Sequence, residues 1–206
     1  MSVVLHEVAH GWVALKQGDD TALRAGRLTL NPIPHIDLFG SIIVPALLWL
    51  APGRVLFGWA KPVPVDPRLF RNYRKGDILV SLAGITANLL LAVAFTLLVV
   101  VLVQLARLAP PLASVLTVLA GMARIGILLN LILAFFNLIP IPPLDGSHVL
   151  AQLLPPDLQN GYRQMGRYGM LVLMALLFLA PRVLEVLLWP ALALDRLAVS
   201  FIQLVA

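Results

Sequence analysis

The sequence predicts an all-α integral membrane protein, a polytopic bundle of about five to six transmembrane helices with a short β element between the first two. Hydrophobic residues make up 60% of the 206 residues and charged residues only 12%, whereas about a quarter of an average soluble domain is charged. The mean hydropathy is +0.94. A soluble core of this size cannot enclose so much apolar surface, so the excess must face lipid. We expect one membrane-embedded domain over residues 1–206.

The composition also excludes several classes of protein. Disorder, a coiled coil and a disulfide-stapled secreted domain do not fit so apolar a chain. The sequence has no Cys, so any metal must be bound by His and carboxylate side chains. The net charge of +5 is more typical of the basic cytoplasmic loops of a membrane protein than of a nucleic-acid binder, and no nucleic acid is expected as a partner.

Apolar segments separated by short polar or Pro- and Gly-rich stretches are the candidate spans. The first two are short for a span of about 20 residues, and the last is interrupted by Pro181 and Pro190, so it is either one span with an interfacial helix or a helical hairpin. Arg124 lies inside the fourth, and the sequence shows no partner for it. The segments are Ser2–Leu15, Leu38–Leu50, Ile78–Leu105, Leu112–Ile139 and the region from Gly169 to Ala206.

The short β element is predicted between the first two segments. Apolar and polar residues alternate over Arg27-Leu28-Thr29-Leu30, and the prolines that follow would end a strand there. His35 and Asp37 come next, and they either orient a metal ligand or form a polar turn.

A nine-residue pattern occurs twice, as Gly84–Ala92 and as Gly126–Ala134. Each copy has a Gly and an Asn four residues apart, which places both on one face of a helix. This pattern is typical of close helix packing with Asn88 and Asn130 as interhelical hydrogen-bonding residues. Nine residues are too few to establish a duplication.

The stretch His6-Glu7-Val8-Ala9-His10 carries the strongest chemical signal. Positions four apart lie one above the other on a helix, so the two imidazoles can bind one metal ion. Glu7 is adjacent to the first ligand, which lets its carboxylate reach a metal-bound water and act as the general base. Ionisable groups in an apolar segment are costly and indicate a function.

A catalytic zinc usually has three protein ligands, and Asp145 is a candidate for the third. It follows an apolar run that prolines at 140, 142 and 143 interrupt. Irregular backbone at membrane depth is tolerated where it lines a cavity or is buried in protein. On the residues alone, Asp145 is either a metal ligand or part of a plain turn before the next helix.

These motifs together resemble the site-2 protease family of intramembrane zinc metalloproteases. The His-Glu motif and the later Asn137–Gly146 run are matched in the family's order by further stretches, and the likeness covers roughly residues 4–150. The further stretches are Ala25–Pro32, His35–Asp37, Gly58–Pro64 and Ala83-Gly84 with Asn88. The resemblance is to a minimal bacterial or archaeal type, since no PDZ-like insertion or CBS-like domain is evident.

The resemblance implies the roles of individual residues. His6, His10 and Asp145 would bind one Zn²⁺ per chain, and Glu7 would activate water. Asn137 matches a family position that holds the substrate backbone, and Asn88 would line the substrate path or serve helix packing. The catalytic core would cover about residues 1–150, with C-terminal helices over about 166–206. Members usually have Pro where this chain has Ile85, which weakens the local break but does not affect zinc binding.

Positive charge gives the expected orientation. If successive spans alternate in direction, one face has more Lys and Arg than the other and is therefore cytoplasmic. The basic residues of that face are Arg54, Lys61, Arg68, Arg71, Arg74, Lys75, Arg163 and Arg167, against Lys16, Arg24, Arg27 and Arg107 opposite. His6 and Asp145 both fall near the first face, so the active site is expected on the cytoplasmic side of a prokaryotic plasma membrane.

The sequence thus predicts a zinc metalloendopeptidase that hydrolyses peptide bonds within or near transmembrane helices of other membrane proteins. Such a helix hides its own carbonyls and must unwind before cleavage, and the residues Arg27–Leu30 could pair with the unwound strand. A membrane metal-binding transporter or a catalytically inactive scaffold homologue is the alternative. The sequence does not identify the substrate or the oligomeric state.

Overall fold

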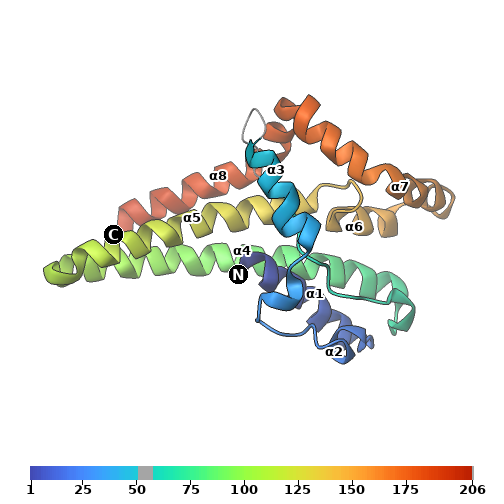
Figure 1. Ribbon diagram of the computed structural model, residues 1–206, viewed down its shortest axis with the longest axis horizontal. Helices are drawn as coiled ribbons and strands as arrows, with labels where there is room; N and C mark the ends of the chain where they lie inside the picture. Colours follow the sequence, from blue (N-terminus) through green and yellow to red (C-terminus); the bar gives the residue numbers. More distant parts are fainter. Residues whose placement is uncertain (51–57, 206) are drawn as a thin grey trace. The chain divides into compact units, whose positions relative to one another are not determined.

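The computed structural model describes residues 1–50 and 58–205, and this part of the chain is built from helices joined by turns and extended segments (Figure 1). A π-helical turn, Leu38–Ile43, runs directly into α3, and single 3₁₀ turns join other elements. The helices are α1 (Ser2–Gln17), α2 (Thr21–Arg24), α3 (Val44–Leu50), α4 (Tyr73–Leu108), α5 (Ala113–Leu138), α6 (Asp145–Leu153), α7 (Pro156–Leu179) and α8 (Pro181–Val205).

The predicted β element is wrong: no strand forms within residues 1–50 and 58–205. The reason is that the backbone groups of Arg27–Leu30 are used elsewhere. The Arg27 N–H donates to the carbonyl of Ala22, 2.9 Å away, and the Thr29 carbonyl accepts from the ring of His35 at 3.0 Å. These groups are therefore not available for a strand ladder.

Two helices of the described chain are long and apolar enough to cross a membrane. They are α4, with 36 residues, and the stretch Pro110–Leu138, which contains α5. The apolar segments predicted at Ile78–Leu105 and Leu112–Ile139 are thus confirmed, and α5 is continuous through Arg124. A third candidate is the pair α7 and α8, if they are counted as one span with a bend of 94° between them.

The expected count of five to six spans is therefore not supported. The first segment, α1, has 16 residues and is about 24 Å long at 1.5 Å per residue, which is shorter than the roughly 30 Å of hydrocarbon in a bilayer. The second, Leu38–Leu50, is shorter still.

The chain divides into two compact units. The first comprises Val3–Gly84 with Met1, and the second comprises Ile85–Ala206 with Ser2, so helix α4 begins in one unit and ends in the other. In the first unit, the buried side chains of Ala14, Phe70 and Val80 join α1 to the start of α4.

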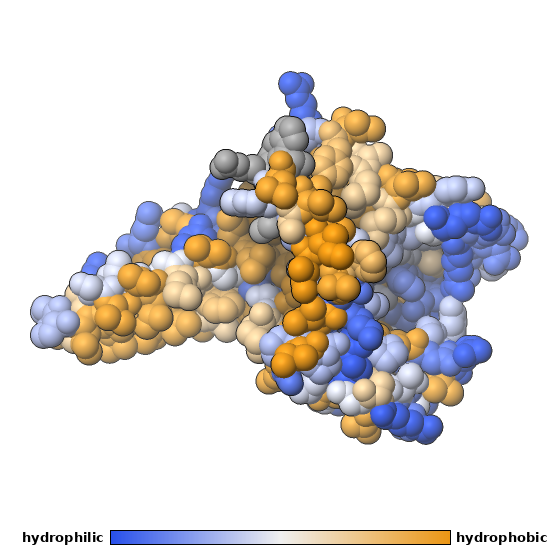
Figure 2. Space-filling view, viewed as in Figure 1, coloured by the Kyte–Doolittle hydropathy of each residue, from blue (hydrophilic) through white to orange (hydrophobic). Residues whose placement is uncertain are grey.

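The second unit packs the later part of α4 with α5 and α8. Its core is rich in small side chains, which let helix backbones approach closely without a hydrophobic driving force between them. Large apolar residues along α4 and α5 stay exposed, as expected for helices that face lipid, and Figure 2 shows apolar surface over these helices and over α3. The buried core residues are Ala92, Val99, Ala120, Ala123, Ile127, Leu131 and Ala191.

Two polar pairs fasten this second unit. Asn88 on α4 donates from Nδ2 to Oδ1 of Asn130 on α5 at 2.8 Å, and both side chains are fully buried. Arg124 on α5 pairs in a bidentate manner with Asp195 on α8, at 2.6 and 2.5 Å. The Asn pattern is therefore an interhelical hydrogen bond, and the partner of Arg124 lies 71 residues further along the chain.

Candidate metal centre

Helix α1 brings His6 and His10 together, because they are one turn apart on the same face. Their Nε2 atoms are 3.0 Å apart, and the rings meet edge to face with centroids 4.6 Å apart. Two imidazole ligands of a tetrahedral zinc have nitrogens about 3.3 Å apart, given bonds of about 2.0–2.1 Å. Both side chains are buried, and the observed separation of 3.0 Å is close to the spacing of two imidazole ligands on zinc.

The ring orientation of His10 is fixed by helix α4. Its Nδ1 atom lies 2.7 Å from the carbonyl oxygen of Val80. A carbonyl can only accept, so Nδ1 carries the proton and donates, which leaves the lone pair on Nε2. This is the usual support of a metal-binding histidine, since the second hydrogen bond fixes both tautomer and direction.

Gly84, one turn beyond Val80 on α4, lies directly against the two rings. A Cβ atom at this position would be 2.5 Å from Cε1 of His6 and 2.6 Å from Nε2 of His10. Carbon atoms in proteins do not approach so closely, so any other residue would displace the imidazoles. The close approach of α1 and α4 therefore depends on this glycine.

We expect Gly84→Ala to lower zinc affinity by about 10–100-fold, the usual loss when the support of a metal ligand is disturbed. Gly121→Ala is the matched control, because a Cβ at Gly121 meets nothing within 4 Å. Zinc content after dialysis against a graded chelator measures the effect. Equal retention by both variants would show that the rings move aside at no cost.

Glu7, between the two histidines, is held by an extended segment, Gly58–Asp66, which we call the strap. The backbone N–H of Val63 in the strap donates to Oε2 of Glu7 at 2.8 Å. The strap passes close to α1, since a Cβ on Gly11 would be 2.9 Å from Cγ1 of Val63. One carboxylate oxygen of Glu7 is thus fixed by a backbone group.

The far end of the strap is held by the side chain of Asp19. The Asp66 N–H donates to Oδ2 of Asp19 at 2.7 Å, and Asp19 is fully buried at the end of α1. The hydrogen bond from the Arg68 side chain lowers the pKa of Asp66 below its usual value. Asp66 therefore stays ionised well below neutral pH.

Asp145 belongs to the second unit, where it begins helix α6. The residue after it, Gly146, lies against the end of α5, and a Cβ there would be 2.1 Å from the carbonyl oxygen of Leu138. The Leu144 carbonyl accepts from the Ser147 hydroxyl at 2.7 Å. The Leu-Asp-Gly sequence thus sets where α6 starts relative to α5, and with it the position of Asp145 in this unit.

The proline-interrupted stretch before Asp145 is fastened by helix α7. Tyr162 donates its hydroxyl to the carbonyl of Pro140 at 2.8 Å. A Cβ on Gly169 would be 2.2 Å from the carbonyl oxygen of Pro142. The sequence patterns did not indicate roles for Tyr162 and Gly169, because each contacts a proline that is more than 20 residues away in the chain.

The two asparagines with expected substrate roles also lie in the second unit. Asn137 is near the end of α5 and donates from Nδ2 to the carbonyl of Leu133, one turn earlier on its own helix, at 3.0 Å. Asn88 is the buried partner of Asn130 described above. This placement favours the packing alternative for Asn88.

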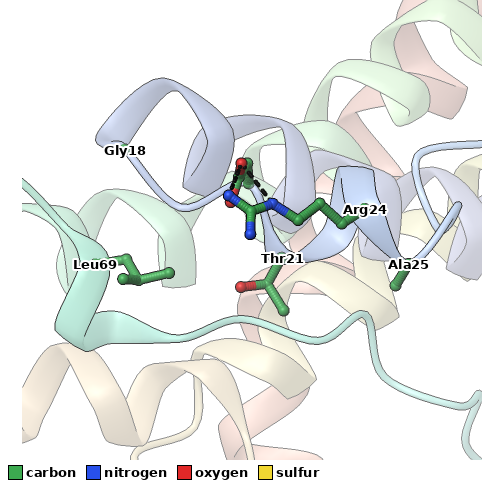
Figure 3. Close-up of a pocket in the computed structure, with 6 residues that line it drawn as sticks. Gly18, Thr21, Arg24, Ala25 and Leu69 are labelled. Carbon is green, nitrogen blue, oxygen red and sulfur yellow. Dashed lines mark hydrogen bonds and ion pairs between the residues drawn. The ribbon is translucent and has the colours of Figure 1, made fainter.

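A separate surface pocket of about 580 Å³ lies beyond the C-terminal end of α1 (Figure 3). Arg24 in its lining pairs with Asp20 at 2.6 Å, and the Arg24 side chain is 78% exposed. None of the predicted site residues lines this pocket. The lining residues are Gly18, Asp20, Thr21, Arg24, Ala25 and Leu69.

Comparisons with known proteins identify the family of the chain. Residues 112–180 match Peptidase family M50. The chain is 44% identical over 197 residues to "Putative zinc metalloprotease YwhC" of Bacillus subtilis, a match that covers 95% of this chain and 84% of that protein.

Two mycobacterial proteins are also similar, both named "Putative zinc metalloprotease Rip2". The chain is 34% identical to the one from Mycolicibacterium smegmatis, over 86% of this chain and 63% of that protein. It is 35% identical to the one from Mycobacterium tuberculosis H37Rv, over 88% and 64%. No solved structure matches the chain. Since the YwhC match extends over most of both proteins, the chain belongs to peptidase family M50, the site-2 protease family, and is a membrane zinc metalloprotease.

Proposed function

We propose that this metalloprotease hydrolyses peptide bonds within or near transmembrane helices of membrane protein substrates, with Glu7 as the general base. The observation that carries the proposal is the geometry of α1. It places the Nε2 atoms of His6 and His10 3.0 Å apart, with Glu7 between them in the sequence, in a chain whose longest helices are apolar enough to cross a bilayer.

His6, His10 and Asp145 are the proposed ligands of one Zn²⁺ per chain. The two imidazoles fit zinc in spacing, in burial and in the tautomer of His10. Asp145 is proposed from the resemblance and from the shortage of other donors, since the sequence has no Cys and only four His. When bound, zinc would supply Lewis acidity, which lowers the pKa of water and polarises a peptide carbonyl.

Glu7 moves the proton in the proposed reaction. Its Oε2 atom is occupied by the Val63 N–H, so Oε1 is the atom proposed to take a proton from the attacking water. The same oxygen then delivers this proton to the leaving amine. A single carboxylate can serve both transfers, because the proton that it takes from water in one step is the proton that it returns in the next.

The substrate must present an extended backbone, because a helix satisfies its own carbonyls. Asn137 is proposed to hold the unwound substrate through its side-chain amide, which can donate and accept. Asn88 remains the weaker candidate for the substrate path. Residues 1–206 are proposed to form one metalloprotease domain with its catalytic core over about 1–150.

The proposed location is a prokaryotic plasma membrane with the active site toward the cytoplasm. Support comes from the basic residues just before α4 and in its first turn, since Lys and Arg within about 15–20 residues of a span mark its cytoplasmic end. His10 contacts α4 at Val80, near the start of that helix. These basic residues are Lys61, Arg68, Arg71, Arg74 and Lys75.

Zinc analysis of the purified protein, combined with a cleavage assay on a reporter transmembrane helix, tests the proposed function. We expect one zinc per chain, loss of cleavage after chelation and recovery when zinc is returned. A soluble unstructured peptide cut faster than the reporter helix would contradict the proposed substrate class.

Asn137→Ala should keep zinc and lose up to about tenfold in cleavage of the helix, the value of one hydrogen bond felt in the transition state.

A further inference from the structure

We propose that Arg27 is a positioning residue for the hydrolytic reaction, because it holds the strap and, through the strap, the carboxylate of Glu7. Arg27 itself is not expected to touch the substrate. The inference rests on the proposed role of Glu7 as the general base, and all the contacts that carry it lie within the first unit.

The strap presents its donors on one edge. The Lys61 N–H donates to the His35 carbonyl at 2.9 Å, and the Val63 N–H donates to Glu7 at 2.8 Å. In an extended chain, residues two apart direct their backbone groups to the same side. Pro62 and Pro64 have no N–H to offer on the opposite edge. The position of the Val63 donor therefore follows from how the Lys61 peptide groups are held.

Arg27 and His35 hold Lys61 by both of its backbone groups. While the His35 carbonyl takes the Lys61 N–H, Nη2 of Arg27 donates to the Lys61 carbonyl at 2.8 Å. The His35 ring lies 3.0 Å from the Thr29 carbonyl through Nε2, so Nε2 must donate. Its Nδ1 is then the acceptor that faces Nη2 of Arg27 at 3.5 Å. The strap is clamped immediately before the residue that holds Glu7.

The surroundings of Arg27 show that this clamp is its main bonding role. Its side chain is buried, and the residue is only 8% exposed. Its Nε atom is buried without a hydrogen-bond partner, and no carboxylate pairs with it in the two described stretches of the chain. The guanidinium is therefore not one half of a salt bridge with any described residue, although a buried charge without an ion pair is costly. Arg24 differs, since it is exposed and paired with Asp20.

Release of the clamp would free the strap to move and Glu7 to change its rotamer. A catalytic group displaced by about 1 Å can lose about 100-fold in rate. Zinc binding should be unaffected, because His6 and His10 are supported by α4 rather than by the strap. Substrate binding should also be unaffected if the clamp acts only on Glu7.

The test compares Arg27→Met with Arg24→Met, which removes the same charge from an exposed position three residues earlier in the sequence. Zinc per chain, kcat and KM on a reporter transmembrane helix are measured for both. We expect Arg27→Met to keep its zinc and its KM within about twofold and to lose about 10–100-fold in kcat, while Arg24→Met stays at the wild-type values. Arg27→Lys, which can still donate to the Lys61 carbonyl, should recover part of the lost kcat.

A double-mutant cycle separates this inference from the proposed function. If Arg27 acts through Glu7, Arg27→Met should not lower the residual activity of Glu7→Gln any further. Full activity of Glu7→Gln would overturn the general base itself. An inactive Glu7→Gln beside a fully active Arg27→Met would overturn only the role of Arg27.

Three other outcomes would also overturn the role of Arg27. A rise in KM at unchanged kcat would mean that the strap holds substrate rather than Glu7. Loss of zinc from Arg27→Met would make the residue a support of the fold. If neither Arg27→Met nor the milder Arg27→Gln accumulates in the membrane, the residue is likewise a folding requirement.

Discussion

Glu7→Gln should bind zinc as the wild type does and lose about 100- to 10,000-fold in cleavage rate, the usual contribution of a general base. The amide has nearly the same size and can still accept from the Val63 N–H, so the local hydrogen bond in the structure is preserved. What changes is basicity, because an amide oxygen does not take a proton from water at neutral pH. The measurement is kcat on the reporter helix at zinc saturation.

Glu185→Gln is the matched control, since Glu7 and Glu185 are the two glutamates of the sequence. Glu185 is exposed on α8, and its variant should cleave at the wild-type rate. Undiminished cleavage by Glu7→Gln would remove the general base from the mechanism. Metal transport that survives in this variant, without any proteolysis in the wild type, would favour the transporter alternative.

His10→Ala should lose its zinc and all measurable cleavage. It removes one of three proposed protein ligands, and a site with two ligands does not hold a catalytic zinc firmly. It also removes the bond to the Val80 carbonyl that fixes the ring. Zinc per chain, measured on protein purified in parallel with the wild type, gives the result.

His148→Ala serves as the control for His10→Ala, because it also removes an imidazole but from an exposed position on α6. It should keep one zinc per chain. Asp145→Ala extends the experiment to the ligand proposed from the second unit, and it should behave as His10→Ala does. Full zinc retention by Asp145→Ala would leave the two histidines as ligands and require another third donor.

Local patterns predicted the parts of the fold that depend on neighbouring residues. Spacing alone placed His6 and His10 on one helix face, and the apolar runs placed α4 and α5 within a few residues. The alternation at Arg27–Leu30 misled, because the backbone groups of these residues bond to Ala22 and His35 instead of to a second strand. The partner of Arg124 could not be found either, since a charge in an apolar helix indicates that a partner exists but not where it lies.

The sequence by itself determined the class of protein, its helical character and the chemistry of the metal-binding motif, because hydropathy and helical periodicity are properties of short stretches. Only the tertiary structure decided what surrounds that motif. The groups that support it include two from the backbone, the Val80 carbonyl and the Val63 N–H. Almost every residue carries such groups, so residue type does not mark which of them will be used. Their role follows from how α4 and the strap pack against α1, which is settled by contacts between distant parts of the chain.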